Sequence, residues 1–425
     1  MMYAQTRIEV ITRTISLNEA VQLAMLNSLE LSMVRKDSAE AEQNILNAKM
    51  ARAPSLGAGM NYNYIGNPVI YRDFYSNDTN ISYYNHQGGW NISAGFPIYM
   101  GGSIQTRIEQ EKIQSQIQNE ILKMTEAQVK LTVISQFYIL YKLYREVEII
   151  EENIKNVKIN IAKIESKVAN GQNIISDLTR TELQLSNFEI SVFIAWNNID
   201  LLSNYLCLFT GIESSTRLVP ADVIVQIPQD TLVYEQCLEE AFTNRNEIKQ
   251  AEYQKYYSEL SLRRTKNALY PHITGNAIYN SELPVPGTFP PQSDILNYWA
   301  VGVGVSYNIS SWYDLNHRIQ ANKIQIEKET INIDRVRNTI DQELKSAYVR
   351  FIESKKNIDS YLKNVELAQI NYKIVKSKYD NEFAPIIDMI DAELQLNEAN
   401  LSLNNAIIDA INQYYNLLYS MGRLN

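Results

Sequence analysis

Residues 358–379, IDSYLKNVELAQINYKIVKSKY, carry the pattern that decides the fold. Apolar side chains recur at alternating intervals of three and four residues, at Ile358, Tyr361, Val365, Ala368, Tyr372, Val375 and Tyr379. This is the heptad spacing of helices that pack along one another in a coiled coil. The stretch therefore predicts a long helix that contacts partner helices along a narrow seam.

The same heptad register occurs a second time, 211 residues earlier in the chain. Subtracting 211 from each position gives Val147, Ile150, Ile154, Val157, Ile161, Ile164 and Val168. Other matches lie 217 residues apart, as Pro54 does from Pro271. The chain is therefore predicted to be a tandem duplication. The change of offset indicates a net deletion between Tyr279 and Arg318, where a hairpin loop tolerates changes in length.

Glycine and proline are distributed unevenly and leave long gaps in the chain. Because these residues cost about 1 and about 3 kcal/mol inside a helix, the gaps predict uninterrupted helices. The predicted helices cover 103–170, 172–210, 229–270, 312–384 and 386–421. At a rise of 1.5 Å per residue, the longest reach roughly 100 Å, which is more than a compact core needs.

Each repeat also contains two segments in which apolar and small or polar residues alternate. The clearest runs from Trp299 to Ile309. Alternation predicts strands with one apolar face, which fits either a half-buried soluble sheet or the lipid-facing wall of a barrel. Aromatic residues toward the segment ends favour the barrel, as does the lack of another element to cover the apolar face.

Four strands are too few to close a membrane barrel, because the smallest barrels use about eight and lipid tolerates no open edge. Closure is therefore expected from several chains, with the polar hairpin tips at 67–87 and 282–297 as extracellular loops. The predicted organisation is as follows: a first repeat over 1–210 with a strand pair at about 55–100, an equatorial connector over 211–230, and a second repeat over 231–425 with a strand pair at about 271–309.

The composition excludes several classes of function. The chain has 48 acidic and 39 basic residues and no basic run, so nucleic-acid binding is not expected. Cys207 and Cys237 form no redox or metal-binding motif, and they are either small buried hydrophobic residues or the halves of a disulfide. His86, His272 and His317 have no nucleophile motif or phosphate loop beside them. An enzyme, a cofactor and a metal site are therefore not expected.

The N-terminal sequence MMYAQTRIEV lacks the basic and apolar blocks of a signal peptide. The chain also lacks the run of 18 or more apolar residues that a transmembrane helix needs. The strand pattern favours an exported protein from which the signal peptide has been removed.

The order of helix, strand pair, long helix and return helix, present twice, resembles the TolC-like outer-membrane efflux family. The sequence SLNEA at 16–20, followed by Ala24 and Asn27, is similar to the family's opening helix. The sequence FPIYMGG at 96–102 resembles its return into the long helix. The resemblance covers residues 15–422 and depends on the order of these phrases in both repeats.

The resemblance implies a mainly helical fold with a small β part. Three chains would form a homotrimer with one outer-membrane β-barrel of twelve strands, four from each chain, continued by a periplasmic α-helical barrel. It also implies a passive exit duct of a tripartite efflux or type I secretion system, which carries small molecules or proteins across the periplasm and outer membrane. The implied partners are outer-membrane lipid, a periplasmic adaptor (membrane fusion) protein and an inner-membrane RND or ABC transporter.

The sequence DMID at 388–391 resembles the family motif that closes the periplasmic aperture, with aspartates at Asp388 and Asp391. Asp177 and Tyr379 match a carboxylate and a tyrosine that link neighbouring helices at this constriction in the family. Carboxylates repeated around a narrow tunnel would bind or repel cations and raise their own pKa values. The alternative is that both aspartates are ordinary solvated positions on one helix face.

The resemblance assigns adaptor docking to the two helix-hairpin tips. The first tip has a turn glycine at Gly171, whereas the second has Glu382, Phe383 and Pro385 in place of glycine. Ala384 occupies a position that is often basic in the family, so a salt-bridge latch there is not expected.

A structural coiled-coil stalk or surface adhesin is the alternative function, since the long helices alone would suit it. The apolar strand pairs, placed alike in both repeats, favour the outer-membrane duct.

Overall fold

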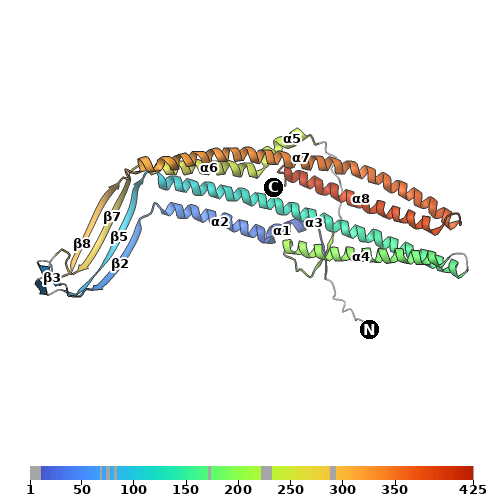
Figure 1. Ribbon diagram of the computed structural model, residues 1–425, viewed down its shortest axis with the longest axis horizontal. Helices are drawn as coiled ribbons and strands as arrows, with labels where there is room; N and C mark the ends of the chain where they lie inside the picture. Colours follow the sequence, from blue (N-terminus) through green and yellow to red (C-terminus); the bar gives the residue numbers. More distant parts are fainter. Residues whose placement is uncertain are drawn as a thin grey trace. The chain divides into compact units, whose positions relative to one another are not determined.

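The computed structural model describes residues 11–67, 69–72, 77–80, 84–170, 174–221, 232–287 and 293–424 (Figure 1). The helices are α1 (Leu17–Asn27), α2 (Leu29–Met50), α3 (Ser103–Ala169), α4 (Ile175–Thr210), α5 (Tyr234–Asn244), α6 (Asn246–Asn267), α7 (Ser311–Asp380) and α8 (Ile386–Ser420). The strands are β1 (Thr12–Ile15), β2 (Ser55–Tyr64), β3 (Val69–Arg72), β4 (Asn77–Asn80), β5 (His86–Met100), β6 (Arg217–Pro220), β7 (His272–Leu283) and β8 (Leu296–Ser306). The predicted class, mainly helical with a small β part, is confirmed.

The chain divides into two compact units, and each contains segments from both sequence repeats. The helical unit comprises Met1–Asp37, Asn119–Gln250 and Ile333–Asn425. The sheet unit comprises Ser38–Gln118 and Ala251–Asn332. None of the helices in the described ranges has the length and hydrophobicity needed to cross a membrane.

The core of the helical unit follows the predicted heptad seams. Val147, Val157 and Ile164 on α3 are almost fully buried, and Ile358 on α7 is also buried. The remaining heptad positions of both helices are at least half-buried. The period of 3.5 therefore identified the faces along which α3 and α7 contact their neighbours.

The prediction of an uninterrupted helix over 229–270 is wrong. α5 ends at Asn244, Arg245 is extended with a φ of −66° and a ψ of 121°, and α6 begins at the next residue. The Arg245 guanidinium is buried and lies 2.8 Å from Glu247 and 2.9 Å from Glu343. This buried ion-pair network favours the break although no glycine or proline is present.

The first repeat has a break at the equivalent position, 217 residues earlier. Ser28 separates α1 from α2 with a ψ of 123°, and its hydroxyl accepts a hydrogen bond from the backbone N–H of Leu31 at 3.4 Å. Serine is a favoured N-cap because its oxygen satisfies a free amide of the first turn. The break is thus a feature of both repeats.

A two-stranded parallel sheet of β1 and β6 was not predicted. Leu218 in β6 is fully buried, and its carbonyl accepts a hydrogen bond from the Tyr144 hydroxyl at 3.0 Å. This sheet joins the start of the chain to the described part of the predicted connector, 211–221. The remainder of the connector, 222–230, lies outside the described residues.

Both cysteines are free and buried. Cys207 belongs to the core cluster around Phe137, whereas Cys237 belongs to the cluster around Phe351. They pack as small hydrophobic residues, which is the first of the two predicted alternatives.

The sheet unit contains a four-stranded antiparallel sheet in the order β2-β5-β7-β8. Tyr279 pairs with Trp299 across β7 and β8 and stacks on Trp90 with ring centroids 5.3 Å apart. Residues directly opposite share a face, so these aromatic residues lie on one side with Val301 and Val305. A second small sheet, β3 with β4, occurs within the first hairpin tip, where only a polar loop was expected.

β5 leads into α3 through two glycines in the left-handed region, Gly101 and Gly102. A Cβ on Gly101 would lie 2.5 Å from the carbonyl oxygen of Asn267. Only glycine fits this close approach, so the turn fixes where α3 starts against the end of α6.

Candidate functional site

The predicted constriction lies where α3 and α7 end and α4 and α8 begin. Tyr379 is buried there in an apolar cluster with Ile164, Ile386, Met389 and Ile390. Pro385 sits directly before the first turn of α8, with a φ of −71° and a ψ of 157°. The proline ends the turn and starts the return helix, and the apolar residues of α8 then fold back onto α3 and α7.

Asp388 and Asp391 are both exposed, one turn apart on α8. The residues between them, Met389 and Ile390, are buried. Within the described ranges, neither aspartate forms an ion pair. The two carboxylates therefore share a solvent-facing side of the helix, opposite its apolar contact with the cluster.

Asp177 lies in the first turn of α4 and is half-buried. The next residue, Leu178, packs against the cluster that contains Tyr379. The two residues predicted to link helices thus occupy the same end of the helical unit. Lys167 on α3 lies with its Nζ 5.3 Å from the centre of the Tyr379 ring.

The turn between α7 and α8 differs from a glycine turn. Glu382 occupies the left-handed region with a φ of 66°, and Phe383 is 84% exposed. Lys167 Nζ lies 3.6 Å from the Glu382 carboxylate. The cation at this turn therefore comes from α3, which sequence reasoning missed because it considered only position 384. Gly171, the predicted first tip, lies outside the described residues.

A buried polar layer, which was not predicted, lies further along α8. Glu393 is 4% exposed, and its Oε1 has no hydrogen-bond partner in the described chain. Burial raises the pKa of this carboxyl, while Gln184 on α4 and Lys376 on α7 lower it. One turn further, Asn153 on α3 donates a hydrogen bond to Asn397 on α8 at 2.5 Å. Glu393 was visible in the sequence only as a repeat marker, because heptad analysis does not reveal which polar positions are buried.

Groups that could bind a metal ion were also sought. No cluster of three or more His, Cys, Asp or Glu residues suited to a metal occurs in the described part of the chain. Two exposed aspartates on one helix face can attract cations, but they provide no complete coordination shell.

Solved structures with a similar fold are all membrane channels or outer-membrane proteins. The Campylobacter jejuni CmeC outer membrane channel matches with a TM-score of 0.78 and 13% identity, over 96% of this chain and 85% of that chain. VceC, an outer membrane protein of Vibrio cholerae, matches with a TM-score of 0.74 and 15% identity, over 96% of each chain. CusC, whose structures describe transmembrane channel formation, matches with a TM-score of 0.78 and 15% identity, over 96% of this chain and 92% of that chain.

At these identities the likeness defines the class by its fold: a channel-forming protomer of the outer membrane. No curated protein sequence matches the chain. Residues 237–423, however, match the family model described as outer membrane efflux protein. The first repeat shares the register of this matched segment, and the chain belongs to the TolC-like outer-membrane efflux family.

Proposed function

We propose that the chain is one protomer of a passive exit duct in the outer membrane. The duct carries small molecules or proteins out of the cell as the last component of a tripartite efflux or type I secretion system. A homotrimer forms it, with the sheets of three chains joined in one barrel and the helices continuing through the periplasm.

The four-stranded sheet is the observation that carries this proposal. β2 and β8 are its edge strands, and on β8 Trp299, Val301 and Val303 are each about 70% exposed. An exposed apolar face suits lipid, but lipid leaves no water to satisfy the open edges. Neighbouring chains satisfy both demands when β2 of one pairs with β8 of the next.

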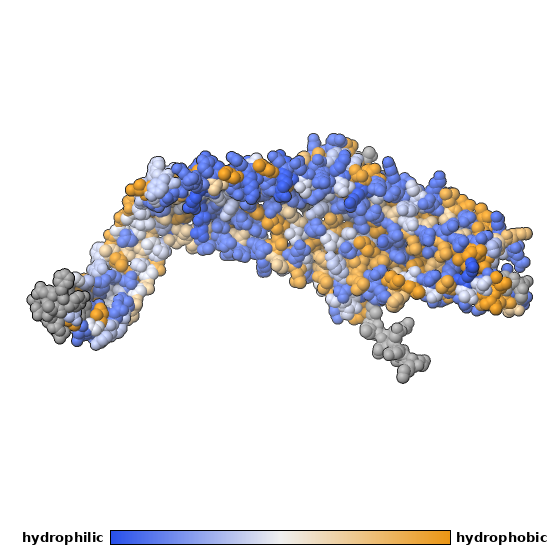
Figure 2. Space-filling model, in the orientation of Figure 1, coloured by the Kyte–Doolittle hydropathy of each residue, from blue (hydrophilic) through white to orange (hydrophobic). Residues whose placement is uncertain are grey.

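The outer face of α4 also supports association. Figure 2 shows hydrophobic residues gathered on the surface over α4 and α8. On α4, Leu183, Phe193 and Leu201 are more than 60% exposed. An apolar stripe of this length on a helix indicates a contact with another protein surface.

In this proposal Asp388 and Asp391 form the aperture, because threefold symmetry brings their exposed carboxylates around one axis. Tyr379 and Asp177 link the helices that narrow it. The helix tips dock the periplasmic adaptor. Phe383 is the strongest support for docking, since a large side chain 84% exposed at a turn offers an apolar anchor.

The assembly is tested by imaging the protein in detergent and in lipid nanodiscs. A hollow cylinder with threefold symmetry is expected. Brominated lipids should also quench fluorescence from Trp90 or Trp299, because both lie on the apolar face of the sheet. A stable monomer without detergent would refute the membrane duct and leave the coiled-coil stalk as the better function.

The aperture is tested in planar bilayers. The wild-type duct should prefer cations and be blocked by trivalent cations from the periplasmic side, since up to six carboxylates surround one opening. Replacing Asp388 and Asp391 by alanine should weaken the block, whereas Tyr379→Phe with Asp177→Ala should raise conductance and keep the block. An unchanged block in the double aspartate variant would show that these residues are solvated surface charges.

A further inference from the structure

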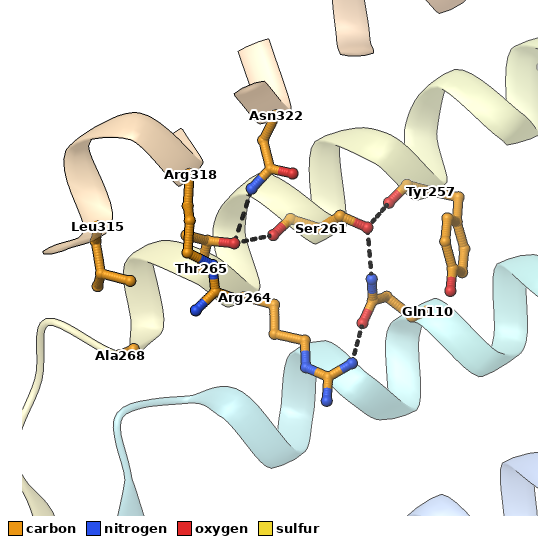
Figure 3. A pocket seen from close by; sticks show the side chains of 9 residues that line it. All are labelled: Gln110, Tyr257, Ser261, Arg264, Thr265, Ala268, Leu315, Arg318 and Asn322. Carbon is orange, nitrogen blue, oxygen red and sulfur yellow. Dashed lines mark hydrogen bonds between the residues drawn. The ribbon is translucent and has the colours of Figure 1, made fainter. Parts of the chain in front are cut away.

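A polar cavity of about 420 Å³ lies within the sheet unit between α3, α6 and α7 (Figure 3). α6 supplies Arg264 and Thr265, α7 supplies Arg318 and Asn322, and α3 supplies Gln110. The cavity is close to the strands, because β7 begins only a few residues after α6 ends. It belongs to none of the sites described above.

Hydrogen bonds between neutral side chains fix the walls of this cavity. Gln110 is buried and donates to the Ser261 hydroxyl at 2.9 Å, and its carbonyl accepts from Arg264 at 3.5 Å. Asn322 donates to the Thr265 hydroxyl at 2.8 Å (Figure 3). The three helices thus hold one another through amides and hydroxyls, which are ordered without neutralising a charge.

The two arginines make the cavity electropositive. Arg264 and Arg318 come from different helices, and no aspartate or glutamate lines the cavity. Among the described residues, neither guanidinium lies within 4 Å of a carboxylate. The neighbouring Arg263 does have such a partner, Glu109 at 3.3 Å. Two unneutralised guanidinium groups in one recess favour an anion that can accept several hydrogen bonds.

The arginine pair exists in only one repeat. Arg318 corresponds to Arg107, but Arg264 corresponds to Asn47 and Gln110 corresponds to Ala321. The duplication would have preserved a purely structural arrangement as easily in both halves. The difference indicates that this one cavity has a ligand.

The position of the cavity on α7 indicates where the ligand lies. Ile309, Trp312 and Tyr313, at the junction of β8 and α7, are each at least 67% exposed. Exposed Trp and Tyr beside an apolar sheet are typical of a membrane interface. Arg318 follows Tyr313 by five residues, or about 8 Å along the helix. That distance matches the depth of lipid phosphates below the interface.

We propose that this cavity binds a phosphate group, held by Arg264 and Arg318 and oriented by the hydroxyl and amide groups of its walls. The phosphate comes from a phospholipid headgroup of the periplasmic leaflet or from a soluble phosphate. The phospholipid source rests on the proposed outer-membrane function, whereas the phosphate chemistry does not.

Native mass spectrometry of the detergent-solubilised full chain tests the proposal. The probes are a phosphatidylglycerol, a diacylglycerol of the same chains and inorganic phosphate. The wild type should retain the phosphatidylglycerol and not the diacylglycerol. Arg264→Gln and Arg318→Gln should each weaken retention at least about tenfold, because each removes charge-assisted hydrogen bonds. Arg107→Gln, the matched position in the first repeat, should leave retention unchanged.

Binding of inorganic phosphate alone, lost in the same two variants, would support the phosphate site and assign it to a soluble ligand. Equal retention of phosphatidylglycerol and diacylglycerol, or equal retention by the wild type and both variants, would overturn the proposal. Bilayer conductance of the same preparations keeps the two proposals separate. A protein that conducts without binding phosphate contradicts only the cavity, and one that binds phosphate without conducting contradicts only the duct.

Discussion

Replacing Glu393 by glutamine should stabilise the folded protein at alkaline pH. The Glu393 side chain is 4% exposed, and burial raises the pKa of its carboxyl. A carboxyl whose pKa is higher in the folded state binds its proton more tightly there than in the unfolded chain. Folding is therefore unpenalised when the group is protonated in both states, and stability is lost as the pH rises from the unfolded pKa through the folded one.

The magnitude follows from the surroundings of the carboxylate. Gln184 on α4 and Lys376 on α7 lower the pKa of Glu393, but its Oε1 has no hydrogen-bond partner in the described chain. Leaving a buried polar group unsatisfied costs about 1–3 kcal/mol, and a charged group costs more. Glutamine has nearly the same volume and no charge, so Glu393→Gln should gain about 1–3 kcal/mol at pH 8.

The measurement is thermal or denaturant unfolding of the purified protein in detergent between pH 4 and pH 8. The gain from Glu393→Gln should disappear at the acid end, where the wild-type carboxyl is also neutral. Glu398→Gln is the matched control, because Glu398 lies on the same helix and is exposed. No gain at pH 8, or an equal gain at every pH, would show that Glu393 is adequately solvated.

Three further changes test separate parts of the structure. Gly211→Ala should cost more than Gly287→Ala in unfolding experiments, because both have positive φ but only Gly211 would place its Cβ within 2.9 Å of another side chain. Equal costs would show that backbone strain alone matters. Arg245→Ala should lose about 3–5 kcal/mol, since it strips a buried network, whereas Arg423→Ala at an exposed pair should lose about 1 kcal/mol or less. Phe383→Ser should reduce export in cells and leave the unfolding temperature unchanged; normal export would remove this residue from the docking surface.

The heptad spacing predicted α3 and α7 because a helix seam is a local, periodic property of the sequence. The break at Arg245 was missed for the opposite reason. Its stabilising partner Glu343 lies 98 residues away, and only the folded chain brings the two within 2.9 Å. The parallel pairing of β1 with β6 likewise joins segments about 200 residues apart, and short strands carry too little alternation to be recognised alone.

The candidate aperture could be predicted only as a set of positions. The sequence placed Asp388 and Asp391 one turn apart, and the structure adds that they are exposed while Met389 and Ile390 are buried. Whether three such pairs face one another depends on contacts between chains. The cation beside Glu382 was missed because Lys167 reaches the turn from another helix, at a position that no motif marks.

The duplication itself indicates where the next chain packs. Leu183 and Leu208 on α4 are 61% and 63% exposed, yet their equivalents 211 residues later, Leu394 and Tyr419 on α8, are half-buried within the same chain. Both helices descend from one repeat, so their corresponding faces require the same kind of cover. α8 obtains that cover inside the chain, whereas α4 lacks it in the single chain. We therefore expect α4 to receive the equivalent contact from a neighbouring copy, which continues the ring of repeats around the axis until it closes.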